Sequence, residues 1–270
     1  MSATLALYRQ FNPWVFLGLS FGLGWGFWGL SLWFEEFAEI FLFLGYLSPA
    51  LAALGTSRLV SRYLTRDILE SLLRLPPVSV AYVYLLSAPF VATLLIVALA
   101  SWQAVEVGEL ALGVLGLPLW GAWASASTGW FGFEIGFRGL LLTRLDARIR
   151  TRVVVDLLMS GLWFLYLTPH IFFPNLQISM NIPLRTGFYA LTLFLLTRIV
   201  HSLYRHFHRS LLLGILVSGS VFYLLELSPK VVEFANVGSV YLGGIISLLV
   251  SSFVIFELLE HHAQHRLFRG

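Results

Sequence analysis

Long apolar runs recur along the whole of this 270-residue sequence, and they constrain its fold more than any other feature. A helix needs about 20 mainly apolar residues to cross the hydrocarbon core of a bilayer. Only 11% of the residues are charged, whereas soluble globular domains have about 25%. Backbone polar groups inside a bilayer must be satisfied within the chain, so the runs predict helices. We therefore expect an all-α, polytopic bundle of membrane helices.

We expect about eight transmembrane helices in a single integral membrane domain that covers residues 1–270. The linkers between the apolar runs are short and give no sign of a second domain. The first run is too long and too aromatic for a cleaved signal peptide, so we count it as a membrane helix. The expected spans are about 13–33, 37–56, 79–101, 115–143, 153–172, 184–204, 210–228 and 238–259.

Arginines gather in alternate loops and predict the orientation of the helices. The loops on one side carry most of the basic residues, whereas those on the other carry only Arg185 and Lys230. By the positive-inside rule, both termini lie in the cytoplasm. We expect a multi-pass protein of the inner or plasma membrane. Because the basic residues report topology, we expect the lipid bilayer and no nucleic acid as a partner.

The loop of residues 61–75 carries apolar residues at helical spacing and an opposite stripe of charged residues. This pattern predicts an amphipathic helix that lies on the cytoplasmic face of the membrane. An ordinary solvated connector helix is the alternative interpretation. Neither interpretation assigns catalysis to this segment.

The stretch "FEIGFRGLLLTRL" places Glu134 and Arg138 inside an apolar span. An ionisable side chain is costly in a membrane, so it is a candidate functional residue. Four residues apart on a helix, the two side chains share one face and form a favourable ion pair. The alternative is that the pair only holds its helix against the neighbouring helices.

This stretch resembles the first motif of the CPBP family of intramembrane proteases, also called the CAAX-protease or Abi family. That motif is Glu-Glu-x-x-x-Arg, commonly followed by glycine. "GYLSPALAALG" at residues 45–55 is similar to the family's second helix, and residues 61–74 lie where the family has a basic amphipathic loop. The resemblance covers about residues 35–228. It implies a CPBP-like core and a site built from a glutamate, histidines and an asparagine.

At the family's catalytic positions the sequence departs from the pattern. The first glutamate corresponds to Phe133, and the histidine of the second motif corresponds to Leu167. The histidine and asparagine of the third motif correspond to Ser218 and Phe222. Phenylalanine and leucine neither bind a metal nor accept a proton. The resemblance therefore implies that Glu134 and Arg138 survive as a structural pair, and that apolar side chains fill the former site.

Histidines elsewhere are weak candidates for replacing the missing groups. His170 lies three residues beyond the second-motif position, about one helical turn away. His261 and His265 are four residues apart, which is a spacing that holds divalent metals. His201 ends the sixth span, where we expect it among lipid headgroups. The chain has no cysteine, which excludes thiolate metal sites.

We expect a non-catalytic CPBP-family membrane protein, a pseudoenzyme that serves as a binding, scaffold or accessory subunit. Its partner would be a membrane protein or a larger membrane complex, and we expect no catalytic residue, no metal and no cofactor. The alternative is an active CPBP-family intramembrane endopeptidase with a rearranged site around Glu134 and His170, in which case zinc is the expected cofactor. A transporter is a third hypothesis, but the spans carry no polar path and no inverted repeat.

Overall fold

The computed structural model describes residues 10–74, 123, 125–172, 182–207 and 209–219. Within these ranges every element is a helix, so the expected all-α class is confirmed for this part of the chain. The predicted spans 79–101 and 238–259 lie outside the described residues. The elements are α2 (Pro13–Trp33), η1 (Glu35–Phe37), α3 (Ala38–Val60), α4 (Arg62–Leu73), α8 (Phe131–Phe133), η2 (Glu134–Leu142), α9 (Thr143–Asp146), α10 (Arg152–Phe172) and α11 (Ile182–His206).

Three of the described helices are long and apolar enough to cross a membrane: Pro13–Trp33, Glu35–Val60 and Arg152–Pro169. Their outward sides carry large apolar side chains, among them Leu32 and Leu157, which are more than half exposed. Their polar residues Ser20, Ser48 and Asp156 are buried instead. This inside-out distribution matches a protein whose surroundings are lipid.

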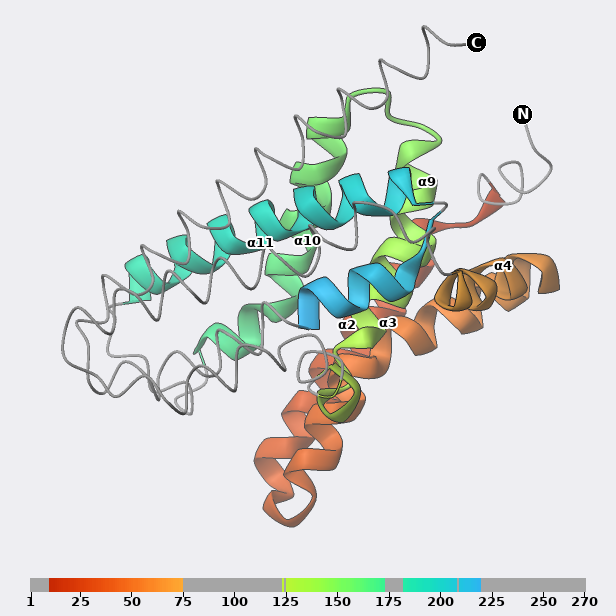
Figure 1. Ribbon diagram of the computed structural model, residues 1–270. Helices are drawn as coiled ribbons and strands as arrows, with labels where there is room; N and C mark the ends of the chain where they lie inside the picture. Colours follow the sequence, from red (N-terminus) through yellow and green to blue (C-terminus); the bar gives the residue numbers. More distant parts are fainter. Residues whose placement is uncertain (1–9, 75–122, 124, 173–181, 208, 220–270) are drawn as a thin grey trace, which may run out of the picture.

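Helix α2 packs along α3, and α10 packs along α11 (Figure 1). The π-helix η2 contacts both α3 and α10, so it joins the two pairs. Asn12 begins α2, because its side chain accepts a hydrogen bond from the backbone N–H of Trp14 at 3.0 Å. Pro13 follows at the first helical position, where a missing N–H costs nothing. Residues 211–219 are also helical.

Pro49 lies inside α3 and removes one hydrogen bond from that helix, because proline has no N–H. The carbonyl that would have accepted this bond belongs to Gly45. The hydroxyl of Tyr166 on α10 donates to it at 2.6 Å. Ser48 Oγ lies 2.5 Å from the same hydroxyl and donates to the Ser20 carbonyl of α2 at 3.0 Å. The hydrogen bond missing from α3 is thus replaced by polar contacts that join α2, α3 and α10.

Gly132 on α8 and Gly136 on η2 lie close against the backbone of α3. A Cβ added at Gly132 would lie 2.5 Å from the carbonyl oxygen of Tyr46, and one at Gly136 would lie 2.5 Å from that of Pro49. Small residues four apart let membrane helices approach backbone to backbone. The two glycines therefore hold the segment that carries Glu134 directly against α3.

The predicted continuous span 115–143 is wrong in its described part. The chain turns at Gly129, whose φ of +78° belongs to the left-handed region that glycine adopts readily. A new helix then begins at Phe131. The carbonyl of Phe43 passes 2.7 Å from where a Cβ on Gly129 would lie, so α3 occupies the space that a side chain would need.

Helix α4 matches the amphipathic helix expected for residues 61–75, and Ser61 caps it by accepting from the N–H of Tyr63. Its apolar stripe, however, packs on the protein: Leu64 and Ile68 are fully buried, and α4 contacts α3 and η2. The outer side carries the pair Arg66–Glu70 at 2.5 Å. The hydrogen bond to Glu70 raises the pKa of Arg66 above its ordinary value.

Candidate functional site

Glu134 and Arg138 both lie on the π-helix η2, which continues directly from the short helix α8. Arg138 Nη1 donates to Glu134 Oε1, so the two side chains that the sequence places four residues apart are in contact. Both side chains are buried, at 0% and 3% exposure. Helices with i→i+5 hydrogen bonding are rare and recur at functional sites. This backbone, with its buried charges, makes η2 the candidate site.

The guanidinium of Arg138 stacks on an aromatic face as well as pairing with Glu134. Its Cζ lies 4.6 Å from the centre of the Trp163 ring on α10. Its Nε and Nη2 atoms have no hydrogen-bond partner among the described residues. The positive charge is thus held by one carboxylate oxygen and one ring, and two of its donor groups remain available to a further acceptor.

Gly214 covers the second oxygen of the carboxylate, Glu134 Oε2. A Cβ at position 214 would lie 2.6 Å from this oxygen. Oε2 is buried and has no hydrogen-bond partner within the described part of the chain. The helix of residues 211–219 therefore passes close to the carboxylate. Any larger side chain at position 214 would displace the Glu134 carboxylate.

Phe133, at the position that the resemblance gives to the first catalytic glutamate, is 1% exposed. Among the described residues, five other aromatic rings have centroids within 6.0 Å of the Phe133 centroid. We call this group the aromatic cluster; its members are Trp130 at 4.7 Å, Tyr166 at 5.0 Å, Trp163 at 5.8 Å, Phe137 at 5.9 Å and Tyr46 at 6.0 Å from Phe133. Position 133 thus has neither a proton acceptor nor a metal ligand.

The other positions that the resemblance singled out are as follows. Leu167 is buried in the apolar core. Ser218 is buried, and its hydroxyl donates to the Ile215 carbonyl of its own helix at 3.4 Å. His170 belongs to α10, but its side chain is outside the described part of the structure. Phe222, His261 and His265 lie outside the described residues altogether.

The described residues bring no three His, Asp or Glu side chains together at metal-binding distance. The carboxylate of Glu134 and the nearest described imidazole, that of His201, each have a different partner. Hydrolysis by a metal or by a general base needs such groups to converge on one water molecule. The described part of the chain does not supply that arrangement.

A second buried polar pair was not predicted from the sequence. His201 Nδ1 on α11 lies 2.6 Å from Asp156 Oδ1 on α10, and both side chains are at least 97% buried. The guanidinium groups of Arg198 and Arg205 lie 3.9 Å from the same carboxylate. The expectation that His201 lies among lipid headgroups is therefore wrong. The sequence feature that could have predicted this pair is Asp156, the one acidic residue in its apolar run. An acid in such a run requires a buried partner.

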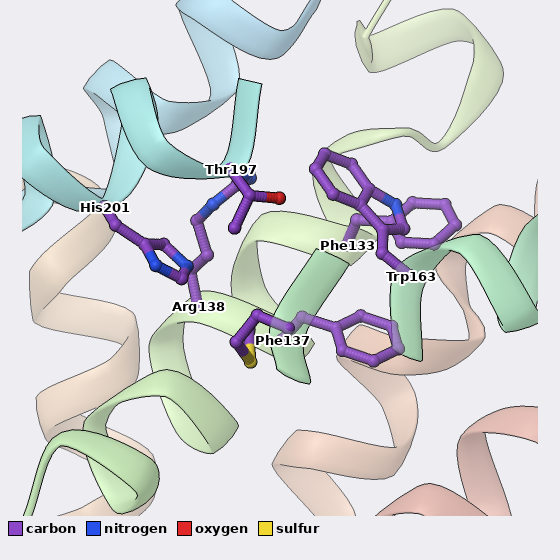
Figure 2. Close-up of a pocket in the computed structure, with 7 residues that line it drawn as sticks. Phe133, Phe137, Arg138, Trp163, Thr197 and His201 are labelled. Carbon is purple, nitrogen blue, oxygen red and sulfur yellow. The ribbon is translucent and has the colours of Figure 1, made fainter. Parts of the chain in front are cut away.

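A small cavity of about 10 Å³ lies between η2, α10 and α11 (Figure 2). Arg138 extends from η2 toward α11, where Thr197 and His201 lie beside it, and the rings of Phe133 and Trp163 lie on the other side. Glu134 does not line the cavity. The cavity volume corresponds to about one water molecule. A peptide substrate therefore does not fit between these residues.

The site thus combines a buried ion pair on η2, a buried aromatic ring at position 133 and a cavity with about the volume of one water molecule. Comparisons of the chain with protein-family models, with curated proteins and with solved structures gave no match.

Proposed function

We propose that this chain is a catalytically inactive relative of the CPBP intramembrane proteases that serves as a binding or scaffold subunit for a membrane partner. The proposal includes the finer architecture expected from the sequence: about eight spans, a CPBP-like core and both termini in the cytoplasm. It also includes a location in the inner or plasma membrane.

The observation that carries the proposal is the packing of Phe133. At the position where the family has a catalytic carboxylate, an aromatic ring packs against five others of the described residues. A hydrolase must hold and deprotonate water at this point, because water alone is a weak nucleophile. A phenylalanine in a close-packed aromatic cluster offers no group at position 133 that could accept a proton from water or bind a metal. Glu134, the remaining carboxylate, is held by Arg138 and covered by Gly214.

A structural role for the Glu134–Arg138 pair also fits its surroundings. The pair lies where η2 contacts α3 and α10, and its charges are buried in an otherwise apolar core. Removing one partner of a buried pair leaves an uncompensated charge, which is strongly destabilising. We infer that the pair holds η2 in register with its neighbours.

For a binding role, the exposed aromatic residues of α2 are the best candidates for partner contacts. Trp14 and Trp33 stand at the two ends of this helix, 76% and 85% exposed. Tryptophans at such positions anchor a helix at the membrane interface. They are also the residue type most enriched at the energetic centres of protein interfaces.

The test is purification from native membranes in a mild detergent, with measurement of particle mass and bound metal. The scaffold proposal predicts a reproducible complex of fixed composition without stoichiometric zinc. A monomer that carries one equivalent of zinc would overturn it and favour the endopeptidase. Trp14→Ala tests the α2 face, and Tyr63→Ala on α4 is its matched control because Tyr63 is also 76% exposed. Loss of the complex only in Trp14→Ala places the partner on α2.

A further inference from the structure

The cavity between η2, α10 and α11 has a polar side formed by Arg138, Thr197 and His201. All three residues are at least 98% buried. Four of their polar atoms have no hydrogen-bond partner among the described residues: Arg138 Nε, Arg138 Nη2, Thr197 Oγ1 and His201 Nε2. Buried polar groups in native proteins are nearly always hydrogen-bonded to protein or to ordered water. The concentration of four such atoms around one cavity therefore indicates a shared partner.

The Asp156 carboxylate determines which ring nitrogen of His201 carries the proton. Asp156 Oδ1 lies 2.6 Å from His201 Nδ1. Because an ionised carboxylate only accepts, the proton of the neutral ring is on Nδ1. His201 Nε2 is then a lone pair that needs a donor. Arg138 has the opposite requirement, because a guanidinium only donates.

The occupant must therefore accept from Arg138 and donate to His201 Nε2. A halide or carboxylate accepts but does not donate, and a metal ion would be repelled by the guanidinium. Water satisfies both groups, and the threonine hydroxyl supplies a third partner in either direction. The cavity volume of about 10 Å³ corresponds to one water molecule.

We propose that one ordered water molecule occupies this cavity, accepts from Arg138 and donates to His201 Nε2, with Thr197 as its third partner. This water joins the pair Glu134–Arg138 on η2 to the pair Asp156–His201 between α10 and α11. The three elements then share one continuous buried polar network. The inference goes beyond the proposed scaffold function and does not depend on it.

The direct test is an experimental structure of the wild-type protein in nanodiscs at a resolution that shows ordered water. We expect one density peak at hydrogen-bond distance from an Arg138 nitrogen, Thr197 Oγ1 and His201 Nε2. Direct contact between Arg138 and His201, or a side chain in the cavity, would overturn the proposal. So would the absence of density at a resolution where other buried waters are seen.

A second test reads the tautomer by ¹⁵N NMR of histidine-labelled protein, with His201 assigned by the signal missing from His201→Gln. The proposal predicts a neutral ring with its proton on Nδ1 and a hydrogen bond accepted at Nε2. A ring protonated on Nε2 at neutral pH contradicts it. Thr197→Val, which keeps the shape but removes the hydroxyl, is expected to perturb the Nε2 signal of His201. Ser202→Ala on the same helix is the matched control and leaves this signal unchanged.

Discussion

The ring of Phe133 meets the ring of Tyr166 edge to face, with centroids 5.0 Å apart and planes at 88°. Tyr166 in turn donates its hydroxyl to the Gly45 carbonyl that Pro49 leaves free in α3. One aromatic contact therefore connects position 133 to the junction of α2, α3 and α10. This coupling makes Phe133 a structural residue.

Introducing a carboxylate with Phe133→Glu is expected to destabilise the protein by about 3–5 kcal/mol, because the new charge is buried among aromatic rings. It should not create peptidase activity, since Leu167 supplies no imidazole. Phe133→Leu is the control: it keeps an apolar side chain and is expected to cost about 1–2 kcal/mol. Unfolding free energies in mixed micelles measure both. Equal stability of Phe133→Glu and wild type would show that the site accepts a charge.

The buried pair Glu134–Arg138 is expected to be strongly coupled. Arg138→Leu leaves Glu134 uncompensated and should cost about 3–5 kcal/mol. The double variant Glu134→Leu/Arg138→Leu should cost less than the sum of the two single variants, with a coupling of about 0.5–3 kcal/mol. A double-mutant cycle on unfolding free energy measures this.

The matched control for that cycle is the pair Arg66–Glu70, which has the same four-residue spacing but is 75% and 48% exposed. Arg66→Leu should leave stability unchanged within error, because exposed pairs contribute little. Additive effects at Glu134 and Arg138 would contradict the structural role of the buried pair.

Gly136→Ala is expected to destabilise the packing of η2 on α3. Its Cβ would lie 2.5 Å from the carbonyl oxygen of Pro49, a backbone atom that moves only with its helix. Overpacking of this kind costs about 1–3 kcal/mol. Gly55→Ala is the control, since nothing lies within 4 Å of a Cβ there, and alanine stabilises an open helical site. The two variants should shift the thermal midpoint of unfolding in opposite directions. Shifts in the same direction would contradict the close packing of Gly136 on α3.

The proposed orientation, with both termini in the cytoplasm, can be tested with single cysteines because the chain has no cysteine of its own. Single cysteines introduced at Leu59 and Arg148, both exposed, should react with an impermeant maleimide only from the cytoplasmic side. A cysteine at Glu36, also exposed, should react only from the other side. Labelling of sealed right-side-out and inverted vesicles distinguishes these outcomes. Reaction of position 36 and position 148 from the same side would contradict the predicted orientation.

The long helices were predictable because apolar length alone determines them. The predicted spans 13–33, 37–56, 153–172 and 184–204 correspond to α2, α3, α10 and α11 within a few residues. The turn at Gly129 was not predictable, because the apolar run continues through it and only the neighbouring Phe43 carbonyl reveals the constraint. The π-helix was also hidden, since the spacing of Glu134 and Arg138 suits an ordinary helix equally well.

The candidate site was predictable only in part, for a related reason. Glu134 and Arg138 are neighbours on one helix, so spacing alone brings them together. Asp156 and His201 are 45 residues apart and meet only when α10 packs on α11. Periodicity within a segment carries no information about such a contact. A lone buried acid predicts that a partner exists, without saying which residue it is.

The most direct test of the inactive-protease account is a cleavage assay with purified wild-type protein and the Glu134→Gln variant, using prenylated and transmembrane peptides with and without a chelator. The proposed function predicts no cleavage by either protein under any of these conditions. Chelator-sensitive cleavage by the wild type that disappears in Glu134→Gln would contradict it.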